Sequence, residues 1–179
     1  MIFNQELPTH YNDKPFHTDF REWIRFELLM CDKDLREEIK IPVALQMIFP
    51  TVPQDINEAA EFMLWFYRGG KDFKEIKGKS KNKEVYSFRH DDDYIYSAFM
   101  QCYGIDLLTV DYMHWWRFRA LFRALHDCKF TEIMGYRATE TKDMSDSMKR
   151  FYSDMQKAYK LPLYLSEQYM ADKFKKMRG

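Results

Sequence analysis

Acidic and imidazole side chains gather in one short run of the sequence, His90-Asp91-Asp92-Asp93. Carboxylate oxygens with one imidazole form a ligand set that suits divalent cations. Metal ligands must converge on one point, however, and consecutive residues at the start of a helix point to different sides of it. Carboxylates also stabilise the positive N-terminal end of a helix. We therefore expect this run to begin a helix, and a metal-dependent factor is the less favoured alternative.

A cysteine lies next to an imidazole and a carboxylate at His126-Asp127-Cys128. Residues one and two positions apart on a turn seldom place a base and its orienting group correctly around a nucleophile. His114 has no second histidine or glutamate at the spacing of a metal-binding helix, and we interpret it as structural. The sequence therefore predicts no enzyme activity and no cofactor.

Phosphate contact is conceivable at Gly69-Gly70-Lys71 and along the lysine-rich stretch 71–84. The glycine pair lacks the upstream glycine and the following Ser or Thr of a phosphate-binding loop, so it indicates a helix end. Tyr86 and Phe88 could stack on bases beside the lysines. The 28 acidic and 28 basic residues cancel, however, and give no general attraction to nucleic acid or to a membrane. We predict a solvated loop over 71–84, with nucleic-acid binding as a disfavoured alternative.

Aromatic and basic residues are densest between Asp111 and Leu125. Apolar positions surround most of the helix predicted here from Thr109 onward, which favours a central place in the fold. Arginines and tryptophans share one side of the helical projection, so guanidinium groups can stack on indoles, and both residue types are enriched at binding hot spots. A core helix with paired arginines is the plainer alternative. The predicted protein-interface residues are Trp115, Trp116, Arg119 and Arg123, followed by Trp65 and Tyr67.

A helical framework must position these side chains, and apolar residues do recur at helical spacing through most of the chain. Predicted helix starts lie at Thr18 or Asp19, Asp32, Asp55, Asp91, Thr109, Lys129 and Ser145. Pro42 is expected to interrupt the second helix, because proline removes a backbone donor. Gly69-Gly70, Gly104 and Pro162 are expected helix ends. The predicted fold class is all-α.

The length of 179 residues favours one domain over 1–179, and 46% hydrophobic residues can fill a large core. Residues 1–17 form an expected extended segment, in which Asn12-Asp13 favours the turn of a short β-hairpin. Residues 163–179 form a basic C-terminal tail, expected to be helical with a frayed end.

The three cysteines, Cys31, Cys102 and Cys128, form no metal-type pair and are expected to be reduced thiols. The N-terminus lacks the pattern of a signal peptide. No apolar run approaches the roughly 18 residues that a membrane-spanning helix needs. We therefore expect a cytosolic protein with no membrane partner.

Several blocks of the sequence, in their order along the chain, resemble the bacteriophage gene-product-fifteen family of phages and prophages of Gram-positive bacteria. The blocks are 16–23, 64–71, 94–99, 103–107, 114–122, 129–137 and 150–162. The His-Trp-Trp block at 114–116 and the Gly-Tyr-Arg block at 135–137 are the most specific. Departures fall mainly in the His126-Asp127-Cys128 turn and in the C-terminal tail.

The resemblance implies a role in tail assembly, because genes of this family typically lie between those for the major tail protein and the tape-measure protein. Long-tailed phages keep tail assembly chaperones at this position. It implies a binding partner, either the tape-measure protein or another tail protein, in the bacterial host cytoplasm, and leaves self-association open. The alternative is a structural component of the mature tail or baseplate. The family supplies no catalytic residues.

Overall fold

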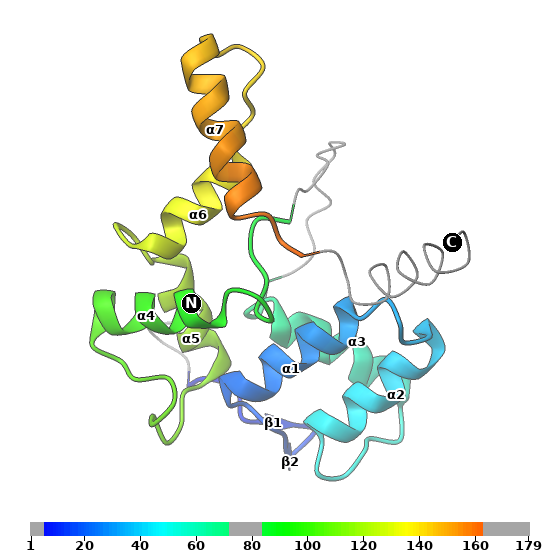
Figure 1. Ribbon diagram of the computed structural model, residues 1–179. Helices are drawn as coiled ribbons and strands as arrows, with labels where there is room; N and C mark the ends of the chain where they lie inside the picture. The colour runs from blue at the N-terminus through cyan, green and yellow to red at the C-terminus, as the bar shows by residue number, and fades with distance from the viewer. Residues whose placement is uncertain (1–5, 72–83, 163–179) are drawn as a thin grey trace, which may run out of the picture. The chain divides into compact units, whose positions relative to one another are not determined.

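The computed structural model describes residues 6–71 and 84–162 of the chain, and helices dominate this part (Figure 1). The helices are α1 (Phe20–Cys31), α2 (Glu37–Ile48), α3 (Ile56–Tyr67), α4 (Asp92–Tyr103), α5 (Trp115–Arg123), α6 (Lys129–Ala138) and α7 (Asp146–Ala158). The strands β1 (His10–Tyr11) and β2 (Lys14–Pro15) pair antiparallel. The predicted all-α fold with a short N-terminal hairpin is confirmed.

The chain divides into two compact units. The first comprises Met1–Ile76 and Val110–Ala124, and so contains the hairpin, α1, α2, α3 and α5. The second comprises Lys77–Thr109 and Leu125–Gly179, and contains α4, α6 and α7. The single domain over 1–179 stays a prediction. The predicted lysine-rich loop over 71–84 lies outside the described residues except at its two ends, residues 71 and 84. The predicted basic tail over 163–179 lies wholly outside them.

The hairpin turns at the predicted Asn12-Asp13 pair. Both residues have positive φ, 47° and 60°, as the two central residues of a type I′ turn require. Asn and Asp tolerate this left-handed conformation better than most residues. The turn sets the register Tyr11 to Lys14 and directs Tyr11 and Phe16 onto aromatic side chains of α3 and the α2–α3 connection.

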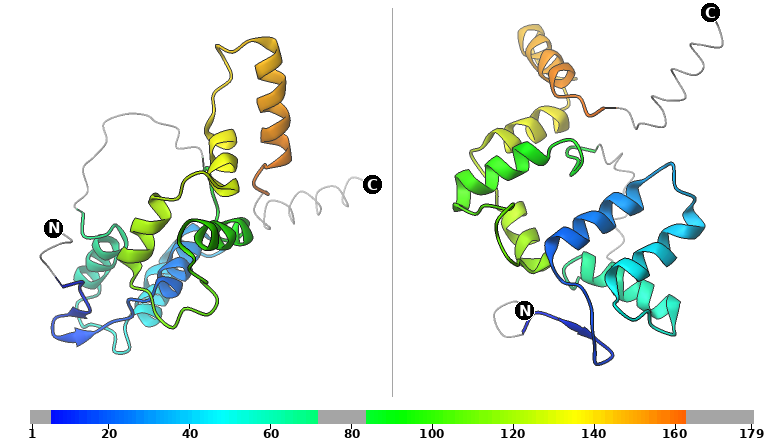
Figure 2. Two further views of the ribbon diagram at one scale, coloured as in Figure 1. Left: turned by 90° about the vertical axis from the view of Figure 1, so that its left-hand side faces the viewer. Right: turned by 60° about the horizontal axis from the view of Figure 1, so that its bottom comes forward.

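Aromatic side chains from α1, α3 and α5 form the core of the first unit. Asp19 caps α1 as predicted, since its Oδ1 accepts from Arg21 N at 3.0 Å. Asp55 caps α3 in the same way by accepting from Glu58 N at 2.9 Å. Trp23, Phe66, Phe118 and Trp115 are at most 2% exposed. Figure 2 shows α1, α2 and α3 as neighbouring helices of this unit.

The expected break at Pro42 does not occur, and α2 is one continuous helix from Glu37. Asp32 does not cap it: the Asp32 Oδ1 accepts from Asp34 N at 2.8 Å in a local turn. Pro42 is exposed, so the Glu38 carbonyl that loses its helical partner can face water. Burial of Ala44, Leu45 and Ile48 beyond the proline holds the helix together, which is tertiary packing overriding local propensity.

The helix predicted from Thr109 begins only at Trp115, with His114 as its N-cap. Residues 113–115 instead pair their backbone with residues 18–20: Phe20 N donates to Met113 O at 2.9 Å and Trp115 N to Thr18 O at 2.8 Å. This pairing holds the chain extended. The expectation of a central helix, apolar nearly all round, is also wrong, because Arg117, Ala120 and Arg123 of α5 are exposed.

The second unit packs α6 between α4 and α7. The helix predicted at 91–103 is confirmed as α4, and Gly104 ends it in the left-handed conformation at φ 62°. The helices predicted after Lys129 and Ser145 are confirmed as α6 and α7. No residue of α7 is fully buried, and α7 lies beside α6 (Figure 1). The ring of Tyr136 on α6 contacts Phe151 and Tyr152 of α7.

Across the described residues, no helix has both the length and the hydropathy needed to span a lipid bilayer.

Candidate functional site

The predicted interface residues gather at the C-terminal end of α3. Two adjacent indoles of α5 donate to its last carbonyls: Trp116 Nε1 to Phe66 O at 2.8 Å, and Trp115 Nε1 to Tyr67 O at 2.9 Å. The last four carbonyls of a helix have no partner within the helix. The Trp-Trp pair therefore serves as a side-chain cap that fixes α5 to the end of α3.

Gly69 and Gly70 make room for this junction, as well as ending α3 as predicted. Their φ angles, 77° and 71°, lie in the left-handed region that favours glycine. A Cβ at Gly70 would lie 2.5 Å from Cη2 of Trp116, and a Cβ at Gly69 would collide with the Arg119 guanidinium. The Trp116 ring and the Arg119 head thus pack directly on the glycine backbone.

Arg119 contacts the aromatic rings of the junction as the helical projection predicts. Its Cζ lies 5.9 Å from the centre of the Trp115 ring and 6.0 Å from that of Tyr67. Tyr67 stacks on Trp115 at 5.5 Å, and its hydroxyl donates to Glu27 of α1. A cation at this position also stabilises the negative end of the α3 dipole.

The six predicted residues differ in how accessible they are. Trp115 is 2% exposed and belongs to the core. Trp65, Tyr67, Trp116 and Arg119 are half-buried, and Arg123 is exposed. The junction itself is a structural contact within the first unit. Its half-buried rim, which includes Trp65, is the part that stays accessible to solvent.

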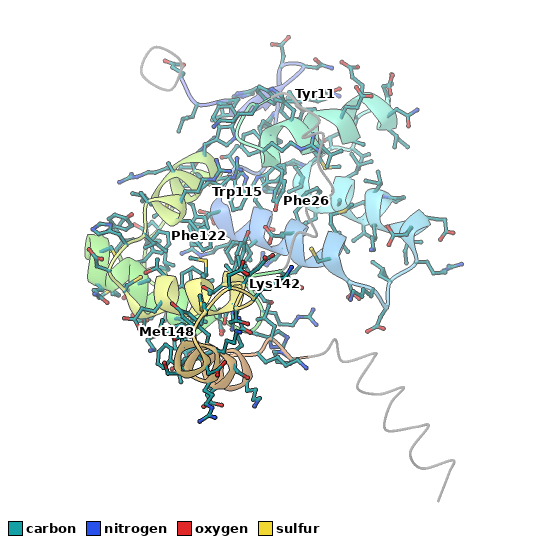
Figure 3. The ribbon with its side chains drawn as sticks, turned by 90° about the horizontal axis from the view of Figure 1, so that it is seen from above. Tyr11, Phe26, Trp115, Phe122, Lys142 and Met148 are labelled. Atoms are coloured by element: carbon teal, nitrogen blue, oxygen red, sulfur yellow. The ribbon has the colours of Figure 1, made fainter. Side chains whose placement is uncertain are left out.

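Two shallow hollows include Tyr11 in their lining on the surface of the first unit. Figure 3 labels Tyr11. One, of about 430 Å³, follows α3 from Glu58 to Trp65 and Lys71. The other, of about 360 Å³, lies between the hairpin turn and the segment that precedes α3. They share Tyr11 and Glu58 and form one continuous depression, which we call the α3 groove. Trp65 is the one predicted interface residue among its lining residues.

Tyr11 carries the one enclosed side-chain polar atom without a hydrogen-bond partner in the described part of the chain, its hydroxyl oxygen. The residue is 8% exposed, and its ring packs 4.6 Å from Phe62 and 5.6 Å from Phe49. Burial raises the pKa of Tyr11 most, followed by the charge and the side-chain contact of Glu58 and then the charge of Asp55, while contact with Asn12 acts in the opposite direction. The phenol therefore stays neutral and keeps its O–H donor.

The acidic run after His90 starts α4 as expected, but its first aspartate has a further role. Asp91 is 1% exposed and accepts from Arg137 at 2.7 and 2.9 Å. Among the residues described, no three His, Cys, Asp or Glu side chains group as metal ligands. Sequence reasoning missed Arg137, because nothing in the local pattern links residues 46 positions apart.

His114 and Cys128 occupy structural positions. The His114 Nδ1 accepts from Trp116 N at 3.0 Å, and Nε2 lies 3.1 Å from Pro8 O, which suits a neutral ring with its proton on Nε2. Burial lowers the pKa of His114. Cys128 is buried at the start of α6, where its thiol lies 3.6 Å from the Thr131 hydroxyl, while His126 is exposed.

Comparison with known proteins gives one match. A family model described as "Bacteriophage Gp15 protein" matches residues 3–161. No curated protein and no solved structure matches the chain. The matched range contains both described units up to the end of α7, including the Trp-Trp junction and the Asp91–Arg137 pair. The chain therefore belongs to the bacteriophage Gp15 protein family.

Proposed function

We propose that this phage protein is a tail morphogenesis factor, a chaperone that binds the tape-measure protein in the host cytoplasm during tail assembly. The observation that carries the proposal is the family match over residues 3–161. The usual position of genes of this family, next to that of the tape-measure protein, gives the partner. Position and analogy are associational arguments, so the partner needs a direct test.

Surface chemistry supports a binding role. Large hydrophobic side chains on the helices are 41% to 51% exposed at Val43, Ile56, Met100, Met148 and Phe151. Methionine and aromatic side chains at exposed helical positions suit adaptable contacts with other helices. Such contacts would keep a long helical partner soluble until tail tube subunits assemble around it.

The exposure of each side chain changes the set of residues that we assign to the interface with the partner. Trp115 is in the core, so its substitution would act through folding. Trp65, Trp116, Tyr67 and Arg119 are partly accessible, and Arg123 is accessible. We retain these five as interface candidates and assign no catalytic step to the protein. The histidine, cysteine and aspartate candidates for chemistry already have structural roles.

Co-expression tests the proposal. The tape-measure protein of the same phage genome is produced with and without this chain, and its soluble fraction and co-purification are measured. We expect the soluble yield to rise and the two proteins to elute together. Unchanged solubility together with no co-elution at low and moderate salt would overturn the chaperone role.

The second candidate is a structural component retained in the mature tail or baseplate. The two units with aromatic cores and the zero net charge of the chain would serve a permanent component equally well. Mass spectrometry of purified virions separates the two. A chaperone is absent from finished particles, whereas a structural component is present at a fixed ratio to the tail tube protein.

A further inference from the structure

The α3 groove has opposite charges at its two ends. Glu58 and Glu61 lie on the N-terminal half of α3, and both are exposed. Arg68 and Lys71 follow the C-terminal end of the same helix and line the same hollow. From residue 58 to residue 68 a helix rises about 15 Å, or roughly three turns. The second hollow adds one acidic and one basic side chain, Asp55 and Lys14, which leave the charge of this end net negative. The groove therefore presents net negative charge at one end and positive charge at the other, over the length of a short helix.

Apolar side chains form the middle of the groove. Phe62 and Trp65 are half-buried, with ring centres 5.6 Å apart, and Leu64 lies beside them. The Trp65 ring packs edge to face against Trp116 with ring centres 5.5 Å apart, and this contact restricts its orientation. An apolar floor between charged ends matches a partner helix that is amphipathic and carries charges of its own.

Tyr11 adds an independent observation, because it lines both hollows. Its hydroxyl is enclosed and meets no partner at full hydrogen-bond geometry within the described residues, although the side chains of Glu58 and Asn12 lie close enough to influence its pKa. Enclosed polar groups normally have such partners, and an unmet one requires an explanation. A bound segment with a polar group at this junction would supply the missing partner.

We propose that the α3 groove is the docking site for an amphipathic helical segment of the tape-measure protein, with basic residues at one end and acidic residues at the other. This inference rests on the proposed function. The basic end lies against Glu58 and Glu61, and the acidic end against Arg68 and Lys71. Helices favour acidic residues at the N-terminus and basic residues at the C-terminus, so the docked helix runs antiparallel to α3.

Charge reversal at the groove tests the site in the full-length protein. Glu61→Lys and Lys71→Glu change the two ends separately, and both native side chains are exposed. Placing like charges across an interface is strongly unfavourable. We expect each variant to weaken tape-measure binding about tenfold or more, measured as an apparent Kd from pull-down titration.

Two matched controls carry the same charge changes outside the groove. Glu38→Lys on α2 matches Glu61→Lys, and Arg117→Glu on α5 matches Lys71→Glu; both native side chains are exposed. We expect both controls to bind within about twofold of the native chain, as is usual for charges away from an interface. Circular dichroism and thermal melting of all four variants establish that the fold is unchanged.

The outcomes separate this inference from the proposed function. If the native chain binds the tape-measure protein and the groove variants bind equally well, the groove assignment is wrong and the chaperone role stands. If the native chain does not bind it, the proposed function fails first. If sedimentation shows a dimer of this chain that Glu61→Lys dissociates, the occupant is a second copy and the inference is overturned.

Tyr11→Phe tests the groove without changing any charge. We expect this variant to bind the tape-measure protein more weakly without loss of stability.

Discussion

Arg137 and Asp91 form a bidentate ion pair inside the second unit, with Nη1 to Oδ2 at 2.7 Å and Nη2 to Oδ1 at 2.9 Å. The same guanidinium donates to the carbonyls of Tyr159 and Val85, at 2.6 and 3.1 Å. Asp91 in turn accepts from Ser87 N at 2.9 Å. One arginine therefore ties the start of α4, the end of α6 and the residue after α7 together.

Removing the arginine should destabilise the protein strongly. Arg137→Ala leaves a buried carboxylate without its counter-charge, which typically costs about 3–5 kcal/mol. The free energy of unfolding in urea measures the loss. The double variant Asp91→Ala/Arg137→Ala should lose much less than the two single losses added together. Lys142→Ala, an exposed change in the same unit, serves as the control and should stay within about 0.5 kcal/mol.

Two glycine substitutions should have opposite effects on stability. Gly70→Ala places a Cβ against the Trp116 ring at a positive φ, and we expect a loss of about 1–3 kcal/mol. Gly135 lies inside α6 with open space where its Cβ would be. Gly135→Ala should therefore stabilise by about 0.5–1 kcal/mol through helix propensity. Thermal melts of the two variants compare them directly, and a Gly70→Ala protein as stable as the native chain contradicts the close packing.

His114 should make stability depend on pH in one direction. Its folded pKa is below the ordinary 6.5 because burial penalises the charged ring. Between the folded and unfolded pKa values the unfolded chain binds more protons, so the free energy of unfolding falls as pH falls. The stabilisation that the neutral, buried His114 ring contributes is complete above the pKa that this histidine has in the unfolded chain. It decreases as pH drops through 6.5 and levels off below the lowered folded pKa.

Urea unfolding between about pH 8 and pH 5 measures this effect, since the histidine titrates within that range. His114→Asn keeps a side-chain acceptor at the helix N-cap and removes the titrating group. We expect this variant to show a shallower decline in stability over the same range. An unchanged pH profile in His114→Asn would show that other groups cause the decline.

Two tyrosine hydroxyls in the first unit should respond differently to removal. Tyr11→Phe deletes an enclosed hydroxyl that has no partner, so stability should stay the same or rise by about 1 kcal/mol. Tyr67→Phe deletes a donor to the Glu27 carboxylate, and should lower stability by about 1–2 kcal/mol. Thermal melting curves of both variants measure these changes in stability. A clear loss in Tyr11→Phe would reveal a hydrogen bond that the folded chain makes in solution.

Local signals in the sequence were sufficient for most helix boundaries. Asp19 and Asp55 cap α1 and α3 where their side chains and the following apolar spacing predict, and Gly104 ends α4. The Asn12-Asp13 turn was also predictable, because few residue pairs accept two consecutive positive φ angles. In these cases the physical cause lies within a few residues of its effect.

Contacts between distant residues were not predictable in the same way. The backbone pairing of residues 113–115 with 18–20 keeps part of a helical pattern extended, and buried apolar residues carry α2 through Pro42. The Trp-Trp segment was singled out as an interface, and that role stays a prediction. Its indoles nevertheless bond to carbonyls about 50 positions away, which spacing along one helix cannot reveal.

The assignment of Val110–Ala124 to the first unit has a consequence for synthesis on the ribosome. The chain leaves the first unit after Ile76, returns at Val110 and leaves again after Ala124. Until α5 has emerged, the last carbonyls of α3 lack their indole donors and Phe20 of α1 lacks its stacking partner Phe118. The first unit therefore completes its core only after the α4 region has been synthesised. No single cut of the polypeptide yields either unit whole.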